Sequence, residues 1–163
     1  MKTTTLIILI FLLVFFGTQI HSQTVVQNPS APQPSLRPLI ATEQEVKQFF
    51  DKYIERYAMK DIDGFLWFFS SKAMQNQVDR LPEIKGIYSN FFNRSQALKY
   101  HMEDRKVEIY ENAVEVKALY VIEQIMIKSK ENKIWRGQGR WVLVKEGGDL
   151  KIFSFDYQNE KAP

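Results

Sequence analysis

The chain has 163 residues, contains no cysteine and carries a formal net charge of +3 at neutral pH. Without cysteine it can form neither a disulfide framework nor a lipoprotein anchor, so an exported form depends on its apolar core for stability. So small a charge, with acidic and basic residues interspersed, argues against a nucleic-acid-binding protein. The aromatic content is high, with 12 Phe, 7 Tyr and 3 Trp, enough to fill a core or line an apolar cavity.

Residues 1–22 have the pattern of a secretory signal peptide. Lys2 precedes an unbroken apolar run over residues 6–16, which is shorter than the roughly 20 residues that cross a bilayer. We expect export to the periplasm or the outside, with cleavage after Ser22; a retained signal that anchors the chain is the alternative. Residues 23–40 are rich in Pro, Ser and Gln and are predicted to form an extended tether. We expect no membrane contact beyond the signal segment.

The first predicted helix begins at a capping box. Thr42 and Glu45 have the spacing at which each side chain satisfies the other residue's backbone N–H group. Apolar side chains recur from Val46 to Tyr57 at intervals of three and four residues, which is the pattern of one buried helix face. The helix is predicted to end near Met59.

Two further helices are predicted before the strands begin. Asp61 is placed to cap a short second helix whose apolar stripe runs to Phe69. The segment 70–80 is polar and is expected to be irregular. Pro82 suits the first turn of a third helix, with an apolar stripe that runs to Phe92.

From Leu98 onward the apolar residues recur with a period of two, which indicates strands. Four successive antiparallel strands are predicted over residues 105–110, 113–130, 134–145 and 150–157. In the second strand, the residues from Val114 to Ile122 share one face. Past Gln124 the apolar residues move to the opposite parity, which predicts a bulge or a bend.

The last two predicted strands are joined by a Gly147-Gly148 hairpin turn. Gly137 and Gly139 lie within the earlier of these strands and are expected to mark bends. The side chains predicted to share a face are Trp135, Trp141 and Leu143 in one strand, and Phe153, Phe155 and Tyr157 in the other.

These elements predict an α+β domain over residues 41–160, with three helices packed on one face of a curved antiparallel sheet of about four strands. Two segments resemble the nuclear transport factor 2-like (SnoaL-like) superfamily, whose cystatin-like fold is a cone. They are FFDKYIERYAMKDIDGFLWFFSSKA, residues 49–73, and GRWVLVKEGGDLKI, residues 139–152. Similarity covers about residues 43–158. Within the superfamily, the chain most resembles exported accessory domains of cell-envelope proteins, which are usually non-catalytic.

The same resemblance allows a test for catalysis. Ketosteroid isomerases of this superfamily have a Tyr on the first helix, a general-base carboxylate after the second and a third acid on the penultimate strand. Tyr53 falls at the first position, Gln77 at the second, and Gly139 or Arg140 near the third. Because Gln cannot accept a proton at useful pH, the resemblance does not support isomerase activity. His101 lacks an orienting partner, and no residue cluster has metal-ligand spacing, so we predict no metal and no cofactor.

Two groups of residues remain as candidates for binding. The residues that could line an apolar cavity with polar handles are Tyr53, Tyr57, Trp67, Tyr120, Gln138 and Arg140. The alternative is that the rings fill the core and that Arg140 pairs with a surface acid. The residues that could form a homodimer interface on the outer face of the sheet are Leu119, Val121, Ile125 and Ile127, since an exposed apolar stripe usually marks an interface. The alternative is that the tether covers them.

The sequence therefore predicts an exported, non-catalytic binding or assembly domain of the cell envelope. Its partner would be a small apolar ligand, an envelope protein or a second copy of the chain, and not a nucleic acid. The alternative is an isomerase, cyclase or dehydratase that acts on a hydrophobic substrate. A cavity above about 300 Å³ that contains a carboxylate would favour the enzyme, and a packed or purely apolar interior would favour binding or scaffolding.

Overall fold

A computed structural model divides the chain into two units, residues 1–34 and 35–163, and describes residues 38–160 of the second. The predicted signal peptide, residues 1–22, and residues 23–37 of the predicted tether lie outside the described residues. At the start of the described part, the backbone N–H of Ile40 donates to the carbonyl of Tyr110 at 2.9 Å. No helix within residues 38–160 combines the length and the apolar character that a membrane crossing requires.

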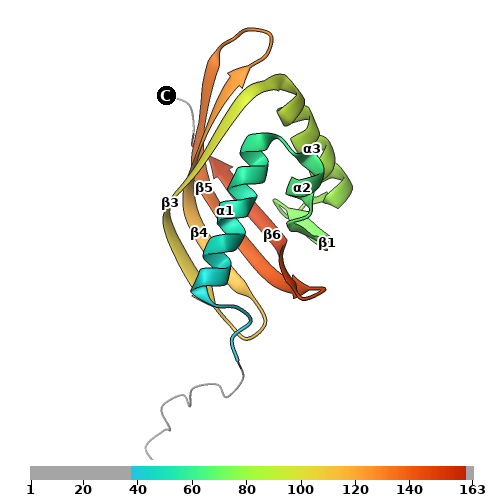
Figure 1. The fold of residues 1–163 in the computed structure, drawn as a ribbon, viewed down its shortest axis with the longest axis vertical. Helices are drawn as coiled ribbons and strands as arrows, with labels where there is room; N and C mark the ends of the chain where they lie inside the picture. Colours follow the sequence, from blue (N-terminus) through green and yellow to red (C-terminus); the bar gives the residue numbers. More distant parts are fainter. Residues whose placement is uncertain (1–37, 161–163) are drawn as a thin grey trace, which may run out of the picture. The chain divides into compact units, whose positions relative to one another are not determined.

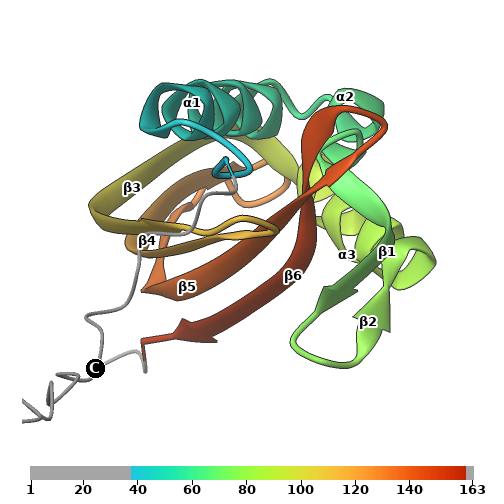
Figure 2. The ribbon, with the colours of Figure 1, turned by 90° about the horizontal axis from the view of Figure 1, so that it is seen from below.

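Three helices and six strands follow one another along the described chain. They are α1 (Glu43–Met59), α2 (Ile62–Leu66), β1 (Phe69–Gln75), β2 (Asp79–Arg80), α3 (Leu81–Arg94), β3 (Ser95–Ile109), β4 (Val114–Met126), β5 (Asn132–Glu146) and β6 (Asp149–Asn159). The strands form one sheet in the order β2-β1-β6-β5-β4-β3. The sheet curves around the helices, which cover its inner face (Figures 1 and 2).

The predicted α+β class and the three helices are confirmed, but the sheet differs from the prediction in two ways. It has six strands rather than about four, and it is mixed because β1 runs parallel to β6. The long strands β3 to β6 are antiparallel, as predicted.

Helix α1 begins and ends as its sequence indicates. The hydroxyl of Thr42 accepts from the backbone N–H of Glu45 at 3.2 Å, and the Glu45 carboxylate accepts from the Thr42 N–H at 2.7 Å. Lys60 ends the helix in the left-handed conformation, with φ of 57°. The buried face of the helix is formed by Val46, Phe49, Phe50, Tyr53 and Tyr57. Two of the chain's tyrosines are thereby directed at the sheet.

Helix α2 is shorter than its apolar stripe suggested, and the prediction of an irregular segment over 70–80 is wrong. Asp61 caps the helix by accepting from the N–H of Gly64 at 3.0 Å. The helix ends at Leu66, however, and Phe69 opens strand β1. Two of the polar residues that concealed this strand, Ser70 and Ser71, are hydrogen-bonded to a distant part of the chain. Buried Ser70 donates its hydroxyl proton to the Glu146 carboxylate at 2.5 Å.

Strand β4 keeps one parity throughout, so the change of parity predicted past Gln124 is wrong, and no bulge interrupts the pairing of β4 with β5. Its register with β5 is unbroken from Val114 to Ile125. Gln124 continues the inward-facing series as a buried polar residue, which leaves Ile125 and Ile127 exposed. The register shifts of this part of the sheet lie instead in β3. The prediction failed because a buried Gln interrupts the apolar pattern of the sequence without changing the direction of the strand.

A bulge does occur where β6 pairs with β5. Val142 pairs with Ser154 and Leu143 pairs with Ile152, so Phe153 has no partner across the strand. Phe153 is exposed, and the prediction that it shares a face with Phe155 is wrong. An extra residue on one strand moves every later side chain by one position, and this is why the parity changes here.

The two glycines of β5 let neighbouring groups pack closely against the strand, and they do not break its register. A Cβ atom on Gly137 would lie 2.0 Å from the carbonyl oxygen of Gln158, and one on Gly139 would lie 2.3 Å from the ring of Trp141. Both glycines stay in register with β4. They let large inward-facing side chains lie flat against the strand.

Candidate functional site

An aromatic cavity of about 180 Å³ opens on the inner face of the sheet. The residues that line it come from every layer of the fold: Tyr53 and Tyr57 of α1, Gln75 of β1, Ile87, Tyr88 and Phe91 of α3, Tyr100 of β3, Tyr120 and Ile122 of β4, Trp135 of β5, and Phe155, Tyr157 and Asn159 of β6. Six of these side chains are tyrosines. The cavity therefore combines apolar walls with several hydroxyl groups.

The polar groups of the cavity are partly satisfied by one another. The hydroxyl of Tyr88 donates to the side-chain oxygen of Gln75 at 3.1 Å, and that of Tyr120 donates to Asn159 Oδ1 at 2.5 Å. The amide nitrogen of Gln75 is buried and has no hydrogen-bond partner among the described residues. The two hydroxyl protons are thus committed to protein oxygens, and the Gln75 N–H groups are free.

Burial keeps the tyrosines protonated. Removal from water raises the pKa of Tyr53, Tyr57, Tyr88 and Tyr100 well above the ordinary value of 10, because the phenolate would be buried without a counter-charge. The same effect raises the pKa of Tyr120 to about 12. The cavity is consequently lined by neutral phenols near neutral pH.

The mouth of the cavity is formed by partly exposed apolar side chains. Ile87 is 42% exposed and Trp135 is 39% exposed. The Trp135 ring contacts Phe91 edge to face, with 6.3 Å between ring centroids. Its indole N–H donates to the buried Gln124 oxygen at 3.1 Å, and the Gln124 amide donates in turn to Ser95 Oγ at 2.7 Å. This buried network fixes the aromatic wall of the mouth.

The described lining contains no Asp, Glu, His, Lys or Arg side chain. His101 is exposed on β3, where it pairs across the strand with Val121. Within residues 38–160, no group of three or more His, Asp or Glu residues is placed to bind a metal ion. Acid–base chemistry in this cavity would have to rely on the phenols alone.

The structure divides the six predicted cavity residues into two sets. Tyr53, Tyr57 and Tyr120 line the cavity, whereas Trp67, Gln138 and Arg140 lie elsewhere. Trp67 follows the short α2 helix and is 51% exposed, with the Lys151 ammonium 3.1 Å from the ring centroid.

Gln138 and Arg140 are exposed because they alternate with residues that face inward. Gly137, Gly139 and Trp141 take the inner positions of β5, so side chains 138 and 140 point to the outer face. The inward direction of Trp141 alone would have been enough to exclude them from the cavity.

Several lining residues were missed by sequence reasoning. Gln75 lies in a strand that was expected to be irregular. Tyr88 belongs to the apolar stripe predicted for the third helix, and Trp135 was predicted to share a face with Trp141 and Leu143, but neither was proposed for the cavity. Asn159 lies at the end of β6 and gives no sequence signal.

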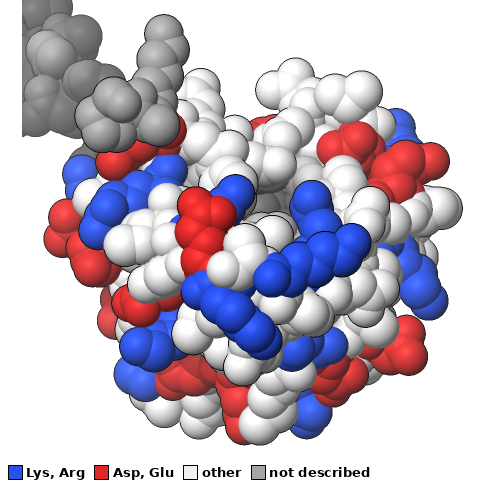
Figure 3. Space-filling model, turned by 90° about the horizontal axis from the view of Figure 1, so that it is seen from above, with Lys and Arg blue, Asp and Glu red and all other residues white. Residues whose placement is uncertain are grey.

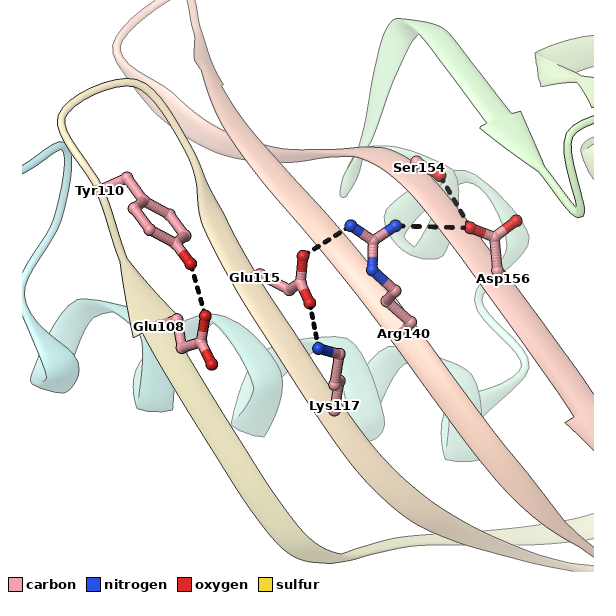
Figure 4. Close-up of polar contacts among 7 residues, drawn as sticks. All are labelled: Glu108, Tyr110, Glu115, Lys117, Arg140, Ser154 and Asp156. Atoms are coloured by element: carbon pink, nitrogen blue, oxygen red, sulfur yellow. Dashed lines mark hydrogen bonds and ion pairs between the residues drawn. The ribbon is translucent and has the colours of Figure 1, made fainter.

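The outer face of the same strands carries an ion-pair network (Figure 4). The Glu115 carboxylate accepts from Arg140 and from Lys117, each at 2.6 Å, and Arg140 also pairs with Asp156 at 3.7 Å. These contacts lower the pKa of Glu115 to about 2, mainly through the hydrogen bond from Arg140. Arg140 thus pairs with surface acids, which was the alternative to a cavity role.

The four predicted interface residues lie along or just beyond β4. Leu119 and Val121 are half-buried, whereas Ile125 is 39% exposed and Ile127 is 44% exposed. Exposed Ile134 of β5 pairs with the neighbouring position Glu123 and extends the apolar area. A homodimer through this surface stays a prediction.

On the face drawn in Figure 3, basic and acidic side chains lie intermingled, and uncharged residues border a hollow. The exposed ion pairs of the described chain include Lys99–Glu123 at 3.4 Å and Lys133–Glu131 at 3.7 Å. Pairs this exposed contribute little to stability.

No protein-family model matches the chain, and no curated protein matches its sequence. Solved structures do match it. A candidate scytalone dehydratase from Novosphingobium aromaticivorans superposes with a TM-score of 0.67 at 12% identity, over 72% of this chain and 83% of that one. A nuclear transport factor 2-like superfamily protein from Salmonella enterica superposes with a TM-score of 0.64 at 12% identity, over 73% of this chain and 91% of that one.

A third match is a protein of Bdellovibrio bacteriovorus, with a TM-score of 0.63 and 15% identity over 72% of this chain. The match spans only 41% of that longer chain. At such identities the likeness establishes the fold alone. The domain therefore has the nuclear transport factor 2-like fold that segments 49–73 and 139–152 predicted.

Proposed function

We propose that the domain is a non-catalytic binding domain, exported to the cell envelope, whose aromatic cavity holds a small, mostly apolar molecule. The observation that carries this proposal is the chemistry of the cavity wall. At about 180 Å³ the cavity is large enough for a ring, and its described lining contains no carboxylate, imidazole or amine.

The lack of a base in the described lining argues against proton-transfer catalysis. A general base must lie within hydrogen-bond reach of the proton that it removes and must titrate near the working pH. The phenols of Tyr53 and Tyr100 have pKa values raised well above 10, so they cannot serve as bases near neutral pH. Gln77, at the position where isomerases have their base, does not line the cavity.

The size of the cavity limits the ligand. Sites for drug-sized molecules usually have volumes of about 300–1,000 Å³, whereas an apolar cavity of about 150 Å³ is enough for benzene. A cavity of about 180 Å³ therefore suits a molecule of one aromatic ring with a small substituent. The edge-to-face contacts of Tyr57 with Tyr88 and with Phe92 favour an aromatic guest, because ring edges and faces attract one another.

The second candidate is a dehydratase or isomerase that acts on a hydrophobic substrate. It is favoured by the fold of the candidate scytalone dehydratase and by buried Tyr53, which could donate a hydrogen bond to a developing oxyanion. This reaction would need a base that the described lining does not supply.

Binding can be measured by NMR titration of the purified protein with benzene, toluene and phenol. We expect saturable shifts for the cavity residues Tyr57, Phe91 and Trp135. In an Ile87→Trp variant, the larger side chain narrows the mouth, so we expect affinity to fall at least tenfold. The matched control is Ile134→Trp, a change of the same size at an exposed outer-face position, which should leave affinity unchanged.

Loss of binding in both variants, or no saturable shift in the wild type, would refute the cavity as a ligand site. Turnover of a hydroxylated aromatic ketone by the wild type, abolished by Tyr53→Phe, would instead establish the enzyme. Export has its own test: the N-terminus of the protein isolated from its host should be Gln23, and a chain that retains residues 1–22 would contradict cleavage.

A further inference from the structure

We propose that the Gln75 side-chain amide is the polar anchor of the cavity and that the ligand is a neutral, one-ring aromatic molecule with a carbonyl oxygen. This inference rests on the proposed binding function and adds the chemical class of the ligand. It starts from a donor that the fold buries and leaves unpaired.

Gln75 is 1% exposed and lines the cavity. Its oxygen accepts from the Tyr88 hydroxyl at 3.1 Å, which fixes the amide so that the oxygen faces Tyr88. The amide nitrogen has no partner among the described residues. A buried N–H group without an acceptor is destabilising, and such groups in a native fold call for an explanation. An acceptor on a bound ligand would satisfy it.

Two hydroxyl groups of the wall are already engaged, because Tyr88 donates to Gln75 and Tyr120 donates to Asn159. The Gln75 amide is a fully buried donor of the described lining that has no partner. A carbonyl oxygen is the ligand group that it would bind. A neutral carbonyl also needs no counter-charge, whereas an ionised ligand would be buried among residues that cannot compensate its charge.

The remaining walls place the ring of the ligand. Phe91, Ile122 and Trp135 form an apolar rim on the side of the mouth. A ligand whose oxygen reaches Gln75 would therefore direct its ring between α3 and β5. Two matched probes separate the polar contact from the apolar one: acetophenone, which has a carbonyl, and ethylbenzene, which has nearly the same shape without it.

The experiment measures the affinity of both probes for the wild type and for Gln75→Met, which keeps the length of the side chain and removes the amide. The ratio of the two affinities is compared between proteins, because the comparison cancels the different solubilities of the probes. We expect the preference for acetophenone to fall about three- to tenfold in the variant, which is the effect of one net hydrogen bond. Ethylbenzene should bind both proteins.

A second readout uses the wild type alone and does not depend on the variant's folding. The side-chain amide resonances of Gln75 should shift downfield with acetophenone and stay in place with ethylbenzene. If both probes bind while the ratio and these resonances do not change, the anchor is refuted and the binding function stands. If neither probe binds the wild type, both proposals fail.

Discussion

The inner and outer faces of strands β4, β5 and β6 carry different kinds of side chain, which alternate along the same backbone. On the inner face, Tyr120, Trp141 and Phe155 are buried, and the polar atoms near them are neutral. On the outer face, Glu115 and Arg140 are charged and pair with each other in contact with water. Position along the strand, more than residue size, decides which environment a side chain meets.

This difference teaches where a ligand can bind and where it cannot. On the outer face, Glu115 pairs with Lys117 and Arg140. On the inner face of the described structure, the Gln75 amide nitrogen and the Trp141 indole nitrogen are buried without a partner, and of the two only Gln75 lines the cavity. The two faces should also respond differently to truncation, to added volume, to alkali and to acid.

Truncation should have the largest effect, and only on the inner face. Trp141 is fully buried and contacts the rings of Phe50 and Phe155, with centroid distances of 5.7 and 4.8 Å. We expect Trp141→Ala to lower the free energy of unfolding by about 3–5 kcal/mol. Ile134→Ala on the outer face should change it by less than about 0.5 kcal/mol. Urea denaturation measures both, and equal losses would contradict the assignment of faces.

Adding a methyl group to a glycine should give the next largest difference in the free energy of unfolding. In Gly137→Ala, the new methyl group would meet the Gln158 carbonyl and the Tyr120 hydroxyl, so we expect a loss of about 1–3 kcal/mol. Gly86→Ala is the control, because its methyl group meets nothing within 4 Å on helix α3. It should stabilise the protein by about 0.5–1 kcal/mol, since alanine favours helix. A stable Gly137→Ala protein would show that the strands are less tightly packed than described.

Alkali should act through the inner face. Tyr53, Tyr57, Tyr88 and Tyr100 have pKa values well above 10, and that of Tyr120 is about 12. The unfolded chain releases these protons near pH 10, so stability is complete below pH 10 and falls as the pH rises beyond it. Absorbance at 295 nm should therefore show delayed ionisation of most tyrosines relative to protein in guanidinium chloride. Ionisation of all tyrosines near pH 10 in the folded protein would contradict their burial.

Acid should act through the outer face, with the smallest effect. The pKa of Glu115 is about 2, below its ordinary value of 4.5, so its stabilisation is present above pH 4.5 and is lost as the pH falls toward 2. We expect Glu115→Gln to cost about 1 kcal/mol at pH 7, because water screens the pair. The difference from the wild type should shrink between pH 5 and pH 3. A difference that is independent of pH would exclude the ion pair as its cause.

The helices of this fold could be predicted from sequence because their signals are local. Thr42, Asp61 and Pro82 each mark the start of a helix, and the apolar stripe of that helix follows within a few residues. All three helices are present. Strand β1 could not be predicted, because the carboxylate that accepts from Ser70 and Ser71 belongs to Glu146, which is far away in sequence.

The site was only partly predictable for a related reason. Tyr53 and Tyr57 follow from the helical stripe of α1, and Tyr120 from the alternation of β4. Gln75 does not, because the burial of a polar side chain depends on how β1 pairs with β6. The one-residue bulge at Phe153 likewise depends on pairing across strands and leaves no trace in the pattern of one strand.

The central claim is that the tyrosine-lined inner face holds a neutral aromatic guest. The most direct measurement is a crystal structure of the protein soaked with bromobenzene, whose bromine gives an anomalous signal that locates the molecule. We predict a peak inside the cavity, between Tyr57, Phe91 and Trp135. A peak found only on the outer face, or a cavity closed by its own side chains, would contradict the account.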